Sequence, residues 1–285
     1  MITIMDGGMG QELMARTEAQ PTPLWATKVL AEEPDLVRAV HDDFFAAGAT
    51  VATTNTYAVH RDRLLPVGLD HRFEQLHRTA CEIASAARDA AGGGRVAGAI
   101  GPLIGSYQTG PQPADAKNRF AEVCRVQAPY VDMFLIETVC ALNHVRNALT
   151  VASGFGKPIW LSVSVDDYDG TKLRSGEPLE KVLDCSDEAD ALLINCATPE
   201  AVTVAVNVIK DCGKPFGAYA NGFTEITQSF VQVGATVQEL STRTDLTPEA
   251  YADFAEDWVR IGATIIGGCC EVGPAHIAEL VRRLT

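Results

Sequence analysis

The sequence has no long hydrophobic run and few basic residues. No stretch approaches the roughly 18 apolar residues that a membrane-spanning helix requires, and the apolar start is too short for a secretory signal. The 23 Lys and Arg are outnumbered by 37 Asp and Glu, which gives a formal charge of −14. Because nucleic-acid binding needs a clustered basic face, we expect neither a nucleic-acid nor a membrane partner, and we expect a cytoplasmic location.

The common cysteine and histidine motifs are also missing. The six histidines form neither H-x-H nor H-E-x-x-H, and the eight cysteines contain no C-x-x-C and no disulfide-framework spacing. This usage is typical of a reducing compartment, in which thiols pack, bind metal or react. Five cysteines are expected simply to pack: Cys81, Cys124, Cys140, Cys185 and Cys212.

Short apolar runs alternate with amphipathic segments eight times along the chain. This pattern predicts βα units around a parallel sheet, and eight of them favour an α/β fold of the (β/α)8 TIM barrel type, as a single domain over residues 1–285. The expected strands are 2–7, 49–57, 95–102, 131–138, 158–165, 191–197, 215–221 and 263–269. The expected helices are 34–47, 72–91, 114–128, 141–153, 178–186, 199–211, 248–261 and 274–284.

In such a barrel the chemistry lies at the carboxyl ends of the strands. Cys196 ends the sixth expected strand, and Cys269 with Cys270 ends the eighth, so the three thiols are expected to meet at one rim. Adjacent cysteines can share an ion only where the strand has ended, and Gly267 and Gly268 permit that bend. A disulfide between sequence neighbours would be strained, so we favour a metal for this pair, whereas the alternative for Cys196 is plain packing.

Three cysteine ligands are typical of a catalytic zinc site, because a structural site has four protein ligands. Soft thiolates favour Zn²⁺ over Mg²⁺ or Ca²⁺. Zinc also favours the deprotonated, nucleophilic form of a thiol that binds to it. The sequence therefore predicts a zinc enzyme that alkylates a thiol substrate. A barrel hydrolase that uses zinc-bound water is the competing class, although such sites more often have His or carboxylate ligands.

Two further strand ends carry candidate substrate contacts. The turn after Asp6 has glycines, among them Gly7 and Gly8, whose amides suit a small carboxylate, although a tight turn alone would also need them. A dinucleotide site is excluded because Leu13 stands at the third glycine of G-x-G-x-x-G. Glu137 follows an apolar run, so its charge requires a cation, either a substrate ammonium or a neighbouring Arg or Lys.

Other polar and aromatic residues at the expected rim have weaker assignments. Asn195, as a substrate contact, and Asn221, as a contact of a methyl donor, either orient the ligand and loops or cap turns. Trp25 and Tyr57 are expected on loops, where they either pack or offer an aromatic face to an onium methyl donor. Two long loops, 103–113 and 223–247, are candidate lids.

Seven segments in order resemble the zinc-dependent homocysteine S-methyltransferases, in the form of a stand-alone homocysteine-binding barrel, over essentially the whole chain. They are D-G-G-M-G-Q-E-L at 6–13, A-G-A-T-V-A-T-T-N-T-Y at 47–57, G-P-L-I-G at 101–105, E-T at 137–138, L-R-S-G-E-P-L at 173–179, I-N-C at 194–196 and G-G-C-C at 267–270. Together they are a specific signature.

The resemblance implies roles for these positions. Cys196, Cys269 and Cys270 would hold Zn²⁺, which would bind the homocysteine sulfur. Asp6, with the amides of Gly7 and Gly8, would bind the amino-acid head, and Glu137 would take its ammonium. The expected reaction is in-line methyl transfer from an onium donor to L-homocysteine, which yields methionine.

The chain departs from the family pattern where the donor would bind. Residues 108–116 lack the usual aromatic and acidic stretch, and A-N-G-F at 220–223 stands where P-N-S-G is more usual. We take S-methylmethionine as the first-choice donor and betaine as the second. The alternative is a homocysteine-binding or redox-sensing zinc barrel without methyltransferase activity. The partners are thus small molecules, and a homo-oligomer is compatible with the sequence.

Overall fold

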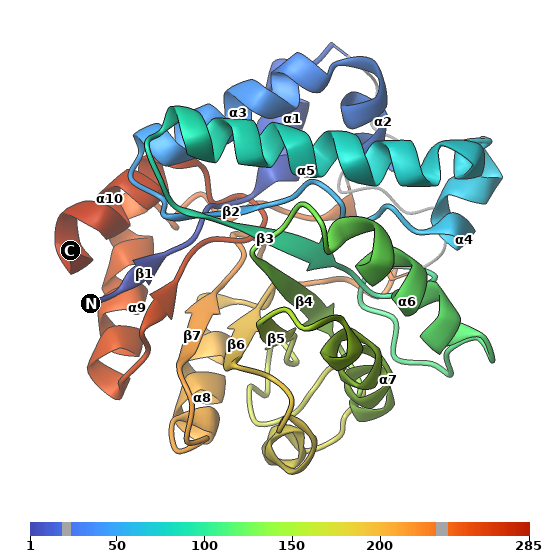
Figure 1. The fold of residues 1–285 in the computed structure, drawn as a ribbon. Coiled ribbons are helices and arrows are strands. Elements are labelled where there is room, and N and C mark those ends of the chain that lie inside the picture. The colour runs from blue at the N-terminus through green and yellow to red at the C-terminus, as the bar shows by residue number, and fades with distance from the viewer. Residues whose placement is uncertain (19–23, 232–238) are drawn as a thin grey trace.

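Eight parallel strands form one sheet in the computed structural model, which describes residues 1–18, 24–231 and 239–285 (Figure 1). The strand order is β1-β8-β7-β6-β5-β4-β3-β2. The sheet closes because Met5 bridges Val51 in parallel and the Asp6 amide donates to Val51 O at 3.0 Å. The predicted (β/α)8 barrel is confirmed. The strands are β1 Thr3–Ile4, β2 Val51–Thr53, β3 Arg95–Ile100, β4 Met133–Val139, β5 Ile159–Val163, β6 Ala191–Asn195, β7 Phe216–Tyr219 and β8 Ile265–Ile266.

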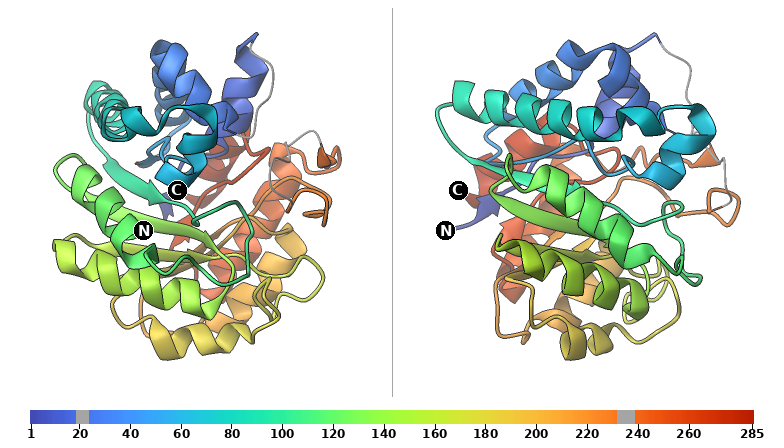
Figure 2. Two further views of the ribbon diagram at one scale, coloured as in Figure 1. Left: turned by 90° about the vertical axis from the view of Figure 1, so that its right-hand side faces the viewer. Right: turned by 45° about the vertical axis from the view of Figure 1, so that its right-hand side comes forward.

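Helices surround the barrel on its outer side, as the turned views show (Figure 2). They are α1 Met9–Arg16, α2 Trp25–Glu32, α3 Pro34–Ala46, α4 Arg61–Leu64, α5 Phe73–Ala90, α6 Ala116–Gln127, α7 Leu142–Ala152, α8 Pro199–Ile209, α9 Pro248–Ile261 and α10 Pro274–Leu284. Short 3₁₀ helices are η1 Leu65–Val67, η2 Asp70–Arg72, η3 Ser153–Phe155 and η4 Leu179–Cys185. Proline begins α3, α8, α9 and α10, where its missing N–H costs no helical hydrogen bond.

Three expectations about the elements were wrong. The helix predicted at 178–186 is the 3₁₀ helix η4. Residues 25–32, which include Trp25, form α2 and not a loop. Several strands are shorter than expected, and β8 ends at Ile266, so Cys269 and Cys270 lie in a turn beyond it. The apolar pattern continues past the last ladder hydrogen bond, and it therefore overestimates strand length.

The barrel interior is filled by side chains from alternate strand positions. They include Val51, Met133, Trp160, Leu193 and Ile265, which pack together as one apolar cluster. A filled interior leaves the carboxyl-end loops as the place for a ligand.

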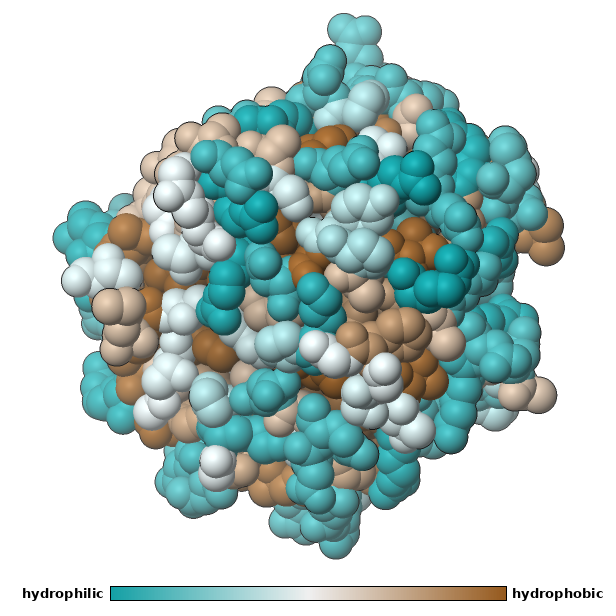
Figure 3. Space-filling model, in the orientation of Figure 1, coloured by the Kyte–Doolittle hydropathy of each residue, from teal (hydrophilic) through white to brown (hydrophobic). Residues whose placement is uncertain are grey.

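The outer surface seen in Figure 3 is mainly hydrophilic, with hydrophobic areas in scattered patches. The two termini lie close together in all three ribbon views, at the end of the barrel where β1 begins (Figures 1 and 2). Among the described residues, no helix is both long and apolar enough to cross a membrane.

Candidate functional site

The three predicted metal ligands lie together at the carboxyl ends of β6 and β8. The sulfur atoms of Cys196, Cys269 and Cys270 are all within 4.8 Å of one another. All three residues line a cavity of about 380 Å³ at this end of the barrel. Tertiary structure thus brings Cys196 to the G-C-C turn across 73 residues of sequence.

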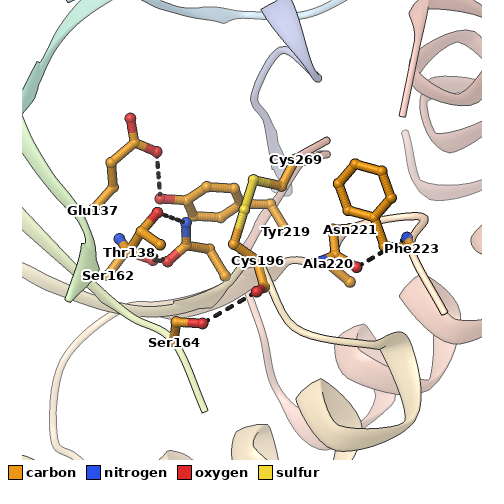
Figure 4. Close-up of a disulfide and its surroundings, with 12 residues drawn as sticks. Glu137, Thr138, Ser162, Ser164, Cys196, Tyr219, Ala220, Asn221, Phe223 and Cys269 are labelled. Atoms are coloured by element: carbon orange, nitrogen blue, oxygen red, sulfur yellow. Dashed lines mark hydrogen bonds between the residues drawn. A yellow bond between two sulfur atoms is a disulfide. The ribbon is translucent and has the colours of Figure 1, made fainter. Parts of the chain in front are cut away.

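Cys196 and Cys269 are joined by a disulfide, and Cys270 is a free thiol (Figure 4). The sequence led us to expect reduced thiols at all three positions. The close approach of the two strand ends explains the difference, because it brings Cys196 and Cys269 near enough either to form a disulfide or, when reduced, to share a metal ion. Burial raises the pKa of the Cys270 thiol to about 12. In this oxidised arrangement two of the three ligands are unavailable, so metal binding requires reduction.

The backbone of Cys196 is held in an uncommon conformation. Its φ angle is +51°, in the left-handed region that non-glycine residues seldom occupy. The Cys196 carbonyl accepts hydrogen bonds from Ser164 Oγ and Arg174 Nη2, both at 3.1 Å. Arg174 in turn forms an ion pair with Asp167 at 2.9 Å, and both side chains are almost completely buried. These contacts fix the direction in which the Cys196 sulfur points.

Asp167 also connects the Arg174 side chain to a neighbouring loop. Its carboxylate accepts the backbone N–H of Thr198 at 3.1 Å and that of Ile226 at 2.8 Å. A buried carboxylate with an arginine and two amides as partners is well satisfied. The loop that begins after β7 is therefore tied to the strand end that carries Cys196.

Two buried carboxylates line the same cavity. Asp6 accepts the Thr53 amide at 2.6 Å and the Thr53 hydroxyl at 2.7 Å. Glu137 accepts the Tyr219 hydroxyl at 3.4 Å (Figure 4), and no Lys, Arg or His nitrogen of the described chain lies within 4.0 Å of either carboxylate. The salt-bridge alternative for Glu137 is therefore wrong within the part of the chain that the structure describes.

The electrostatics of this pair favour a bound cation. Burial raises the pKa of Asp6 to about 7, and burial together with the nearby charge of Asp6 raises the pKa of Glu137 to about 8. Neither carboxylate has a cationic partner among the described residues, so an ammonium group beside them would stabilise their ionised forms.

A local irregularity of β4 positions Glu137. The pairing register of β4 with β5 shifts between Ile136 and Val139, and Thr138 has a φ angle of +58°. Asn195 stabilises this bulge, because its side chain accepts the Thr138 amide at 3.1 Å and donates to the Thr138 hydroxyl at 2.9 Å. Bulges beside active sites commonly redirect a side chain. Asn195 thus orients the loop and is not among the residues of the cavity wall.

The glycines after Asp6 allow two turns to pack closely. A Cβ atom at Gly7 would lie 2.1 Å from Val272 O, and one at Gly8 would lie 2.7 Å from Cys269 O. The Gly8 amide donates to Val272 O at 2.9 Å. The tight-turn alternative therefore applies to Gly8, whose N–H is already engaged, although both glycines line the cavity.

Another part of the cavity wall comes from α4 and from the loops after β2, β3 and β7, and we call it the loop side: Tyr57, Arg63, Tyr107, Gln108 and Phe230. Gln108 Nε2 donates to Val231 O at 2.8 Å, and the rings of Tyr107 and Phe230 are 6.0 Å apart. The loops after β3 and β7 thus contact each other beside the cysteines. A lid role for them stays a prediction, and residues 232–238 of the second loop lie outside the described residues.

The other two candidates for binding the methyl donor are Asn221 and Trp25. Asn221 is buried, accepts the Phe223 amide at 3.1 Å and is not part of the cavity wall (Figure 4). This contact agrees with the alternative role given to Asn221, which is to cap a turn. Trp25 begins α2, and its side chain is not among the described ones.

A family model for homocysteine S-methyltransferase matches residues 3–284. The chain belongs to the homocysteine S-methyltransferase family. It is 28% identical to homocysteine S-methyltransferase 4 of Zea mays, over 98% of this chain and 88% of the maize protein.

Two solved structures of the homocysteine methyltransferase MmuM from Escherichia coli share the fold. The metallated form has a TM-score of 0.80 and the oxidised form 0.81, each at 28% identity over 99% of this chain and 96% of the other. These likenesses extend over the whole barrel.

The sequence alone did not assign a role to several residues that the structure places at or near the site. They are Thr53 and Tyr219, which bond the two carboxylates, and Arg63, Asp167 and Arg174. Thr53 lies in the polar strand end A-T-T-N-T, so the sequence alone could have indicated it as a candidate. Arg174 lies in the L-R-S-G-E-P-L segment of the family signature but had no role assigned, and Asp167 has no local signal, because their contact with the Cys196 region joins segments that are distant in sequence.

Proposed function

We propose that this chain catalyses zinc-dependent methyl transfer from an onium donor to the thiol of L-homocysteine, with methionine as product. S-methylmethionine is the first-choice donor and betaine the second. The observation that carries the proposal is that three cysteine sulfurs line one cavity with two buried carboxylates, which have no cationic partner in the described part of the chain. An amino acid with a thiol side chain matches both features.

The cysteine cluster fits zinc. Cys196, Cys269 and Cys270 would hold the ion after the disulfide is reduced, since three soft donors lie within 4.8 Å of one another and face the cavity. When bound, zinc supplies Lewis acidity that favours the thiolate form of a substrate thiol. The structure of MmuM from Escherichia coli is described as metallated, which supports a metal ion at this site.

The residues of the chain bind and orient the two substrates. Asp6 and Glu137 take the ammonium of homocysteine, and Thr53 and Tyr219 hold these carboxylates in place. Tyr57 offers an aromatic face to the positive charge of the donor. Contact between the loops that carry Gln108 and Val231 excludes water from the reacting atoms, and a displacement needs this alignment and desolvation more than a general base.

A donor panel tests the proposal. Reduced, zinc-loaded protein is incubated with L-homocysteine and, separately, S-methylmethionine, betaine and 5-methyltetrahydrofolate, and methionine is measured. We expect methionine from an onium donor and none after zinc is removed by a chelator. Failure of every donor with zinc-loaded protein, or full activity without zinc, would overturn the proposal.

The disulfide favours a second candidate, a barrel that senses redox state through Cys196 and Cys269. The same assay with and without reductant separates the two. If reduced, zinc-loaded protein binds homocysteine but yields no methionine with any donor, the sensing function is the better account.

A further inference from the structure

The cavity has one cationic side chain on its wall among the described residues, that of Arg63. Arg63 lies in the short helix α4, on the loop side. The cavity also contains three acidic side chains, those of Asp6, Asp62 and Glu137. The charges of the wall are therefore of both signs, with Arg63 as the positive one.

Arg63 has no carboxylate partner within the described chain. Its Nη2 donates to Ser106 Oγ at 3.1 Å, and its guanidinium lies 5.4 Å from the centroid of the Tyr57 ring. No ion pair within 4.0 Å involves it among the described residues. Burial lowers the pKa of Arg63, which indicates a cation that is desolvated without full compensation.

The neighbouring carboxylate of Asp62 is already engaged. It accepts the Ile104 amide at 2.8 Å and the Arg63 amide at 3.1 Å, and it lies 3.4 Å from Arg119. Asp62 therefore fixes the backbone of α4 and the loop after β3. The guanidinium of Arg63 retains donors for a ligand, because an arginine has five N–H groups in a planar fork.

We propose that Arg63 binds the carboxylate of a zwitterionic methyl donor, and that it selects such donors over onium compounds without a carboxylate. This inference rests on the proposed function. The methyl group to be transferred must face the homocysteine sulfur at the cysteines, so the far end of the donor points toward the loop side. There Arg63, whose guanidinium lies over the Tyr57 ring, pairs with the carboxylate in the planar fork geometry that suits it.

Matched donors test this role. Each acid donor is paired with its carboxamide, S-methylmethionine with S-methylmethioninamide and betaine with betaine amide, because the amide keeps the shape and the onium charge. We expect wild type to prefer the acid by about 10–100-fold in kcat/KM, the usual range for a charge-assisted hydrogen bond. In Arg63→Gln the preference should fall to about two-fold or less, with the KM of homocysteine unchanged. Arg63→Lys should restore part of it.

The control is Arg61→Gln, which alters the same helix but removes a guanidinium that pairs with Glu122 outside the cavity wall. It should leave the acid-to-amide preference at the wild-type value. A wild type that does not prefer the acid would overturn the inference. So would an Arg63→Gln variant that loses activity equally toward acid and amide, or one that raises only the KM of homocysteine.

Failure of the proposed function gives a different result, in which no donor yields methionine. The inference is then decided by calorimetric titration of wild type and Arg63→Gln with S-methylmethionine and its amide. Tighter binding of the acid by wild type alone supports the role of Arg63, and equal binding by both proteins overturns it.

Discussion

The two sides of the cavity are built on different kinds of structure. On the cysteine side, Asp6, Glu137, Cys196, Cys269 and Cys270 lie in or just beyond β1, β4, β6 and β8, and ladder and side-chain hydrogen bonds hold them. On the loop side, the wall comes from α4 and from the loops after β2, β3 and β7, which side-chain contacts join to one another. Residues at strand ends are held more rigidly than residues in loops, so we expect the choice of methyl donor to depend on the loop side.

Backbone strain is concentrated at this end of the barrel on both sides. The described non-glycine residues with left-handed φ angles are Ile104, Tyr107, Thr138, Cys196 and Glu271, and each follows a strand or lies in its carboxyl-end bulge. Such conformations persist only where the surroundings stabilise them. On the cysteine side these surroundings are Asn195, Ser164 and Arg174, which are buried or nearly so.

Removal of a metal ligand should have the largest effect. Cys269→Ala leaves two thiols, so bound zinc and methionine formation should both fall to background. Zinc content by atomic absorption and a methionine assay measure this. Cys124→Ala, which alters a buried thiol of α6, is the control and should keep both. Full activity of zinc-treated Cys269→Ala would show that the cysteine side does not work as a three-thiolate site.

Loss of charge at Glu137 should come next. Glu137→Gln keeps the shape beside Tyr219 but removes half of the ammonium site, and we expect the KM of homocysteine to rise about 10–100-fold. The KM of the donor should stay constant. Glu122→Gln, at the ion pair with Arg61, is the matched surface control. If the KM of the methyl donor rises instead, Glu137 contributes to the donor site and not to the homocysteine site.

The pH dependence should follow the two carboxylates. With pKa values of about 7 for Asp6 and about 8 for Glu137, both are largely protonated at pH 6 in the free protein and become ionised as pH rises. Because ammonium binding needs the ionised forms, kcat/KM for homocysteine should increase from pH 6 to 8, by up to about tenfold per unit. Glu137→Gln should lose the upper part of this rise. A flat profile in wild type would contradict the ammonium assignment.

Substitution of Arg174, which contacts the backbone carbonyl of Cys196, should have an intermediate effect. Arg174→Lys keeps a charge opposite Asp167 but loses the fork that reaches the Cys196 carbonyl and Ser164. We expect the zinc dissociation constant to rise about tenfold in a chelator competition. Arg243→Lys, at a surface pair with Glu200, is the control. If the thermal stability of the zinc-free protein falls while zinc affinity is unchanged, Arg174 serves only the fold.

The smallest effect is expected on the loop side. Gln108→Ala removes the hydrogen bond to Val231 and should raise the donor KM about two- to five-fold, with the homocysteine KM unchanged. Gln112→Ala removes a contact to Asn147 from the same loop and should change neither constant. An equal rise in both constants for Gln108→Ala would show that the two sides of the cavity are not independent.

Residue types and their order determined the fold class and the cysteine side. The eight alternations of apolar and amphipathic segments predict the barrel, since a parallel sheet requires buried strands and crossover helices. In a barrel all strands end on one rim, so the order of the strands alone predicts that Cys196, Cys269 and Glu137 lie near one another, as they do along one cavity wall.

Only the tertiary structure decided how these residues are held and which others join them. The disulfide of Cys196 and Cys269, the Arg174–Asp167 pair and the Gly8 contact with Val272 depend on distances between segments that are remote in sequence. The same is true of Arg63, which forms no ion pair with any described residue although Asp62 is its neighbour in sequence. Periodicity reports which face of an element is buried, whereas hydrogen bonding and charge compensation depend on the neighbours that folding supplies.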